Sequence, residues 1–99
     1  TSDGIAIFGE EYNITIKNGN IINWFGDGII GAGGRNCIYS NLNISHTGIY
    51  GMSVGEYSLV KDCNVYYAGE DGFVSKESSF LINCRASFSD RHGFELYIL

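Results

Sequence analysis

The sequence contains no proline, few charged residues and no long apolar segment. A transmembrane helix needs about 18 or more consecutive apolar residues, so none is expected. Only 6 residues are Lys or Arg against 11 Asp or Glu, which gives a net charge of −5. Binding to nucleic acid or to an anionic membrane surface normally requires a basic face. The composition therefore argues against both partners.

Cysteine is also scarce, and the chain has only Cys37, Cys63 and Cys84. An odd number of cysteines does not form a closed disulfide framework, and no spacing typical of a zinc site is present. A free cysteine usually behaves as a small, buried apolar side chain. We therefore expect three free thiols, with Cys63 and Cys84 stacked as neighbours in the core.

Glycine, in contrast, is abundant, and five glycines open similar phrases in which a large apolar residue follows. They lie 24, 23, 21 and 21 residues apart, at Gly4, Gly28, Gly51, Gly72 and Gly93. A second column of Asn or Asp has intervals of 23, 21 and 21 residues, at Asn18, Asn41, Asp62 and Asn83. Two columns with matching intervals indicate an internal repeat of about 21 residues.

Apolar residues fall into register when the chain is aligned on these two columns. The aligned sets are Ile5, Ile29, Met52, Phe73 and Phe94; Ile16, Tyr39, Val60 and Leu81; and Ile21, Ile44, Val65 and Ala86. Alternate residues around them are polar, which is typical of strands. Three short strands per repeat, without hairpin turns between them, predict a solenoid in which each strand pairs in parallel with its equivalent in the next coil.

We therefore predict an all-β protein, a right-handed, single-stranded parallel β-helix of four to five coils. Residues 1–99 form a single domain, which we expect to be a fragment of a longer solenoid. The Asn column marks tight turns, because Asn tolerates left-handed backbone angles, and stacked Asn side chains can bond one another along the axis. The glycines mark strand entry, where a side chain would crowd the backbone.

Parts of the sequence resemble known repeat proteins. The stretch from Tyr12 to Ile21, with its Asn18-Gly19 pair, and the coils around Cys63 and Cys84 are similar to phrases of pectin-lyase-like β-helix proteins. The resemblance implies a secreted or cell- or virion-surface protein and a polysaccharide ligand. In that superfamily sugar chains lie along the first strand of each coil, beside the long turn that precedes it. Fold does not decide among its lyases, epimerases, hydrolases and tailspikes.

The long turns of this chain cover residues 23–27, 46–50, 67–71 and 89–92, and polar side chains concentrate there. The candidate catalytic residues are Asp71, Asp90, His92 and Glu95, and the candidate ligand-binding residues are Asp27, Glu70, Arg91 and Trp24. Paired carboxylates can perform glycosidic chemistry, and a neighbouring cation or acid shifts their pKa values. His46 aligns with Asn23, Tyr67 and Phe88, and we predict that it points inward as a hydrogen-bonded core histidine.

No cofactor is expected. Calcium is the one alternative, because Glu70, Asp71 and Asp90 come from neighbouring coils, but Ca²⁺ needs six to eight oxygen ligands and no characteristic loop spacing is present. The leading hypothesis is a module that binds or presents polysaccharide. One alternative is a fragment of a polysaccharide lyase, epimerase or glycoside hydrolase. Another is a self-associating spike or filament, because the apolar segment Gly93 to Leu99 and the uncapped first coil expose strand edges.

Overall fold

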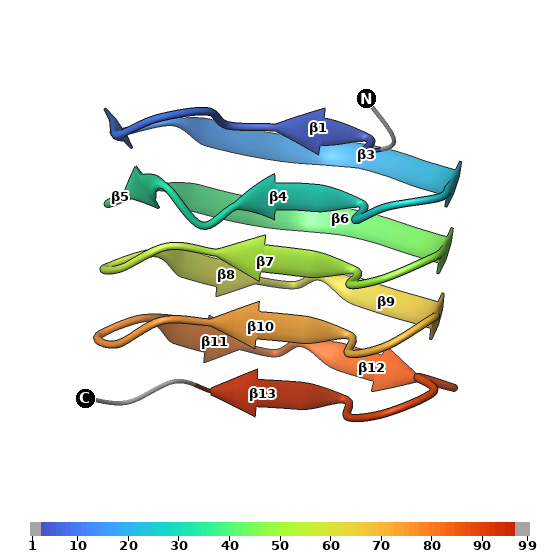
Figure 1. Ribbon diagram of the computed structural model, residues 1–99. Coiled ribbons are helices and arrows are strands. Elements are labelled where there is room, and N and C mark those ends of the chain that lie inside the picture. The colour runs from blue at the N-terminus through green and yellow to red at the C-terminus, as the bar shows by residue number, and fades with distance from the viewer. Residues whose placement is uncertain (1–2, 97–99) are drawn as a thin grey trace.

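The computed structural model describes residues 3–96, in which the chain winds as a right-handed parallel β-solenoid of about four turns (Figure 1). This winding confirms the predicted parallel β-helix. No helix long and apolar enough to cross a membrane is found in this part of the chain. The last three residues of the apolar segment that ends at Leu99 lie outside the described residues.

The first strands of the coils pair in parallel as one sheet, which we call the first-strand sheet. From the first coil to the last, its strands are β1 (Ile5–Ala6), β4 (Ile29–Gly31), β7 (Met52–Val54), β10 (Phe73–Ser75) and β13 (Phe94–Leu96). Their order in the sheet equals their order in the sequence, because each coil lies directly on the one before it.

The second and third strands of the coils form a larger sheet that bends at the Asn column. In the first two coils one long strand follows the whole path, and in the next two the path is divided in two. The strands are β3 (Thr15–Trp24), β6 (Ile38–Thr47), β8 (Leu59–Lys61), β9 (Asn64–Ala68), β11 (Phe80–Ile82) and β12 (Arg85–Ser87).

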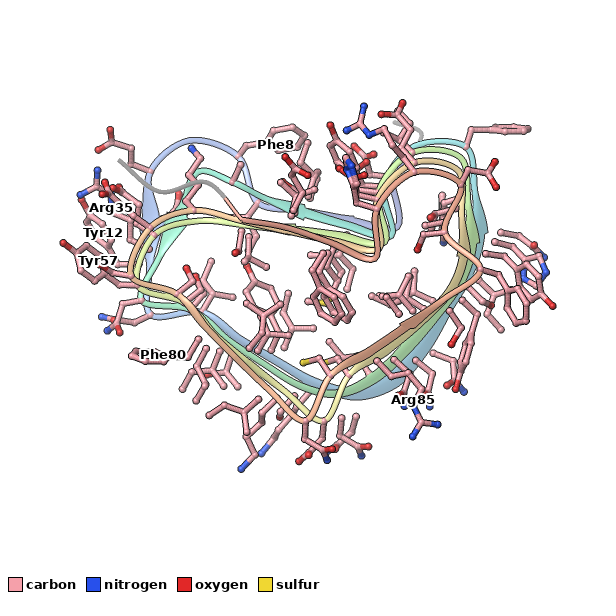
Figure 2. The ribbon with its side chains drawn as sticks, turned by 90° about the horizontal axis from the view of Figure 1, so that it is seen from below. Phe8, Tyr12, Arg35, Tyr57, Phe80 and Arg85 are labelled. Atoms are coloured by element: carbon pink, nitrogen blue, oxygen red, sulfur yellow. The ribbon has the colours of Figure 1, made fainter. Side chains whose placement is uncertain are left out.

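The first two coils are longer than the others, and their extra residues lie between the first and second strands. There β2 (Glu11–Tyr12) pairs in parallel with β5 (Gly34–Arg35). Figure 2 shows this wider loop of the first coil next to Phe8, whose side chain is exposed. The rest of the path keeps one length in every coil, so the other columns of residues stay in register.

The core is made of the aligned apolar columns, and the observed strand register confirms each of them. Ile5 pairs with Ile29, Ile29 with Met52, Met52 with Phe73 and Phe73 with Phe94. Cys37, Cys63 and Cys84 are free, and Cys63 is fully buried. Burial raises the pKa of the Cys63 thiol to about 11, so this thiol stays protonated at neutral pH.

The chain turns through left-handed residues that recur every five positions within a coil. Among residues 3–96, twelve non-glycine residues have φ between 53° and 65°. They form three columns: Asn13, Asn36, Tyr57 and Ser78; Asn18, Asn41, Asp62 and Asn83; and Asn23, His46, Tyr67 and Phe88. The sequence pointed only to the middle column, because Tyr, Phe and Ser give no strong signal for this conformation.

The prediction that His46 points inward is wrong. Its left-handed backbone shifts the in–out alternation by one residue, so His46 is exposed while Thr47 is buried. The imidazole stacks on the ring of Tyr67 with ring centroids 5.0 Å apart, and Tyr67 stacks on Phe88 at the same spacing. The last three members of the third left-handed column thus form an exposed aromatic stack on the outside of the solenoid.

Asn side chains form hydrogen-bonded ladders along the outer surface of the coils. In each pair the amide N–H donates to the oxygen of the equivalent residue one coil earlier. The pairs are Asn36 to Asn13 (2.6 Å), Asn41 to Asn18 (2.9 Å), Asn43 to Asn20 (3.3 Å), Asn64 to Asn43 (3.1 Å) and Asn83 to Asp62 (2.7 Å). We call the column of Asn18, Asn41, Asp62 and Asn83 the corner ladder.

The glycine column lies where the backbones of neighbouring coils come close together. A Cβ atom added at Gly28 would lie 2.6 Å from the carbonyl oxygen of Gly51, and one added at Gly51 would lie 2.6 Å from that of Gly72. Such a contact cannot relax by moving a flexible side chain, because the obstacle is backbone. Glycine is therefore required here by the spacing of the coils.

We expect Gly51→Ala to lower the free energy of unfolding by about 1–3 kcal/mol, the usual cost of overpacking. The new methyl group would meet both the Gly72 carbonyl and the Val65 side chain. Gly19→Ala is the matched control, because no atom lies within 4 Å of its added Cβ. Urea denaturation of both variants measures the difference, and equal midpoints would contradict the close approach of the coils.

We expect Asn83→Ala to lower the free energy of unfolding by about 1 kcal/mol, since it removes the bond to Asp62 and places Ala at φ 53°. Asn83→Gly separates the two contributions, because glycine adopts this backbone angle without strain. Thermal denaturation of the two variants should rank the glycine variant as the more stable. The reverse order would show that the left-handed conformation is unimportant.

Candidate functional site

The candidate residues lie beside the first-strand sheet, on the turn that leads into each first strand. The residue before each glycine of the glycine column forms a further column, which contains Asp3, Asp27, Tyr50, Asp71 and His92. A carboxylate in this column accepts the backbone N–H of the next member: Asp3 from Asp27 at 2.8 Å, Asp27 from Tyr50 at 3.0 Å and Asp71 from His92 at 3.0 Å. These aspartates therefore join successive turns to one another.

Asp71 is the most strongly held member of the column. Its side chain is fully buried, and Arg91 donates from Nε to Oδ1 at 3.0 Å and from Nη2 to Oδ2 at 2.8 Å. This pairing with Arg91 holds the pKa of Asp71 below its ordinary value and raises the pKa of Arg91. Asp71 is thus ionised at neutral pH, and its contacts suit an acceptor that orders the turn better than a proton donor.

Asp27 occupies the same place two coils earlier, but its pKa moves in the opposite direction. Burial is the main cause of the rise, and the negative charges of Asp3 and Glu70 add to it, while the Tyr50 N–H opposes it. Asp71 has an arginine in contact, whereas the charges acting on Asp27 are acidic. The pKa values of the two carboxylates therefore shift in opposite directions, because only Asp71 is paired with an arginine, Arg91.

His92 and Glu95 form a second partly exposed polar pair at this edge. His92 Nδ1 lies 2.9 Å from Glu95 Oε2 and 3.3 Å from Asp71 Oδ1. Two carboxylate oxygens around one ring nitrogen require a hydrogen on Nδ1, and in the neutral imidazole Nε2 is then the acceptor. About half of the His92 side chain is exposed, so Nε2 is the atom of this pair that is suited to take a proton from a bound molecule.

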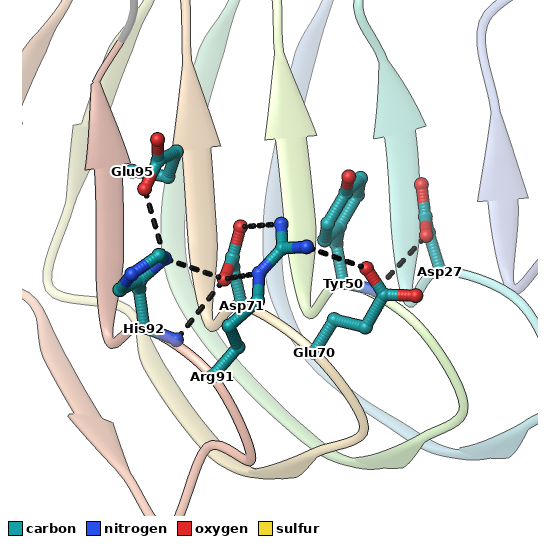
Figure 3. Close-up of polar contacts among 7 residues, drawn as sticks. All are labelled: Asp27, Tyr50, Glu70, Asp71, Arg91, His92 and Glu95. Atoms are coloured by element: carbon teal, nitrogen blue, oxygen red, sulfur yellow. Dashed lines mark hydrogen bonds and ion pairs between the residues drawn. The ribbon is translucent and has the colours of Figure 1, made fainter.

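The structure brings most of the candidate residues into one polar row that crosses successive coils (Figure 3). The row contains Asp27, Tyr50, Glu70, Asp71, Arg91, His92 and Glu95. Arg91 lies at its centre, because its Nη1 also lies 3.5 Å from Glu70 Oε1. Tyr50 is a member that the sequence analysis missed, and its place before Gly51, equivalent to Asp27 and Asp71, was the signal that pointed to it.

Two candidate residues lie apart from the cluster. The exposed Asp90 contributes its backbone N–H to the carbonyl of Ala68 at 3.0 Å. Trp24 ends β3 in the first coil, in register with the buried Thr47, and is 40% exposed. A Cβ atom added at Gly4 would lie 3.1 Å from Trp24 Nε1, so the indole packs beside the turn that leads into β1.

Asp71, His92 and Glu95 are close enough to share an ion, since their ligand atoms lie within 4.8 Å of one another. However, Asp71 already accepts hydrogen bonds from Arg91 and from the His92 N–H. A cation would also meet the positive guanidinium of Arg91. Three such groups fall short of the six to eight oxygens that Ca²⁺ takes. The arrangement fits an ion-pair network better than a calcium cage.

We expect Asp71→Asn to lower the free energy of unfolding at neutral pH by about 2 kcal/mol, because it removes charge-assisted hydrogen bonds. A carboxylate with a lowered pKa stabilises the fold above its ordinary pKa of 3.8, and that stabilisation is lost as the pH falls through the folded-state pKa. The variant should therefore lose stability less steeply in acid than the unmodified chain.

Asp27→Asn is the matched control. Its amide oxygen can still accept the Tyr50 N–H, and the substitution removes a buried charge whose pKa is raised. We expect its free energy of unfolding at neutral pH to be unchanged or higher. Urea denaturation across a pH series measures both variants. Equal losses for the two would show that Arg91 does not distinguish these positions.

No protein-family model, curated protein or solved structure matches this chain. The solenoid is thus assigned from its own strand register, at the level of a parallel β-helix. A β-helix of this kind can carry binding sites or enzymatic sites, and the fold does not choose between them. A function has to be argued from the side chains of the polar row.

Proposed function

We propose that this protein is a secreted or surface module that binds an acidic or neutral polysaccharide along the polar row. The observation that carries the proposal is the direction of the row. Its members come from successive coils and follow the solenoid axis beside the first-strand sheet. Coils repeat about every 4.8 Å, so an extended chain lying along the axis would meet polar groups at each step.

The chemistry of the row suits sugar hydroxyl groups. Arg91 presents a planar, partly exposed guanidinium, and Glu70 and Glu95 are partly exposed carboxylates. Sugar hydroxyls both donate and accept hydrogen bonds, so they are matched by a surface that carries both kinds of group side by side. Asp71 neutralises Arg91 in part, and the further carboxylates Asp27, Glu70 and Glu95 make the row acidic as a whole.

The similarity of the sequence to pectin-lyase-like phrases supports the same proposal, since that group binds sugar chains along the first strands. It also suggests the alternative of an enzyme that acts on polysaccharide. The His92–Glu95 pair favours this alternative, because Nδ1 of His92 is held by a carboxylate and about half of the side chain is exposed. Such an imidazole can act as a general base toward a sugar C–H or O–H.

Affinity electrophoresis in gels containing polygalacturonate, alginate or a neutral glucan tests the proposal. We expect at least one polymer to retard the unmodified chain. Glu95→Gln and His92→Gln should weaken that binding about tenfold, which corresponds to about 1.4 kcal/mol. Glu10→Gln is the control, because Glu10 is an exposed acid outside the row.

Equal mobility of the unmodified chain in all three gels and in a blank gel would refute the proposed function. Binding that Glu95→Gln and His92→Gln leave intact would place the ligand elsewhere. The enzymatic alternative is tested by incubating the unmodified chain with the same polymers and following the ultraviolet absorbance of unsaturated products and the release of reducing ends. Product that the unmodified chain forms and the His92→Gln variant does not would establish the enzymatic alternative in place of binding alone.

A further inference from the structure

The corner ladder contains a break at Asp62. Each ladder bond runs from an amide N–H to an oxygen one coil earlier, as from Asn41 to Asn18 and from Asn83 to Asp62. Asp62 follows Asn41 in the column, because Ser40 pairs with Lys61 in the adjacent strands. An ionised carboxylate has no hydrogen to donate. At the step between Asn41 and Asp62 the ladder therefore has acceptors on both sides, the Asn41 Oδ1 atom and the Asp62 carboxylate, whereas the step before it and the step after it each have an amide donor.

An open hollow of about 510 Å³ lies over this break. Its lining includes Asn41, Asp62, Asn64, Tyr66, Asn83 and Arg85. Arg85 lies on the side of the solenoid opposite the first-strand sheet and Phe8 (Figure 2). The hollow is therefore a different surface from the polar row.

The neighbouring ladder supplies a second set of polar groups to the same hollow. Asn64 donates to Asn43 at 3.1 Å, which leaves its own oxygen directed toward the next coil. The next residue in that column is Arg85, which pairs with Asn64 in the strand register. The hollow thus combines exposed acceptors at Asn41 and Asp62 with exposed donors at Asn83 and Arg85.

We propose that this hollow is a second saccharide-binding site, in which sugar hydroxyls bridge the break in the corner ladder. A hydroxyl can donate to the facing oxygens of Asn41 and Asp62, and an adjacent hydroxyl can accept from Arg85 or from the outward N–H of Asn83. The partly exposed ring of Tyr66 offers an apolar surface for the C–H groups of the sugar.

A saccharide fits this lining better than a bare cation. Four of the six lining groups named here are neutral, and Arg85 places a positive charge in the same hollow. A cation would be repelled by the guanidinium, whereas vicinal hydroxyls use donors and acceptors together. The site does not depend on the proposed function of the polar row, because the two surfaces share no residue.

Asp62→Asn separates the structural role of the ladder from the binding role. Asparagine at this position can donate to Asn41 and still accept from Asn83, so it completes the ladder. We expect the denaturant midpoint to stay unchanged or rise, while saccharide binding weakens at least about tenfold. Arg85→Gln should also weaken binding. Lys61→Gln is the control, because Lys61 is exposed beside Asp62 but does not line the hollow.

The experiment is an NMR titration of the isotopically labelled chain with maltohexaose, cellohexaose and hexagalacturonate, in which the side-chain amides of Asn41, Asn64 and Asn83 are observed. At least one probe should cause saturable shifts of these amides that Asp62→Asn abolishes and Lys61→Gln retains. Absence of shifts with all three probes, or equal shifts in Asp62→Asn, would overturn the proposal. Equal shifts on adding calcium chloride alone would identify a cation site instead. Backbone shifts at His92 and Glu95 report on the polar row separately.

Discussion

The parallel hydrogen bonds between successive coils hold equivalent residues about 4.8 Å apart, and most other features of this protein depend on that spacing. A residue in one coil meets its own equivalents above and below it. Apolar residues in register, such as Ile29 and Met52, then form a continuous core. The same rule allows only glycine at positions such as Gly51, where the backbone of the next coil leaves no room for a Cβ atom.

Stacking of equivalent residues restricts polar and charged columns more severely than apolar ones. A column of amides is self-complementary, because each Asn donates to one neighbour and accepts from the other. A column of carboxylates is not self-complementary, because ionised carboxylates only accept hydrogen bonds. Each buried aspartate therefore needs a donor from the following turn. Asp71 meets this requirement through Arg91 and the His92 N–H. Asp27 has the Tyr50 N–H but lies near further acids, and its raised pKa records the difference.

Both proposed binding surfaces arise where a column departs from this regularity. The polar row is varied because its column changes from Asp to Tyr, back to Asp and then to His, which places different chemical groups on successive coils. The hollow lies where Asp62 interrupts a run of Asn. A solenoid with identical coils would present a uniform surface, so the exceptions in the repeat are the positions at which a specific ligand can be distinguished.

The sequence by itself determined the fold class, the aligned apolar columns and the glycine and Asn columns. Each follows from the repeat, and a repeat that stacks in register must bring like positions together. The sequence also placed Asp71, Arg91, His92 and Glu95 on one edge, since they precede or enter first strands of neighbouring coils. It did not reveal the left-handed turns at Tyr57, His46 or Phe88, whose residue types give no such signal.

The tertiary structure alone decided which of these polar residues are buried, paired or accessible. Asp71 and Asp90 are both acids of the long turns before first strands, yet Asp71 is fully buried beneath Arg91 and Asp90 is exposed. The outward direction of His46 was likewise hidden, because one left-handed residue reverses the alternation of a strand. Such outcomes depend on the reach of single side chains and on the path of single turns. A repeating pattern describes what the coils share, so these individual differences are seen only in the folded structure.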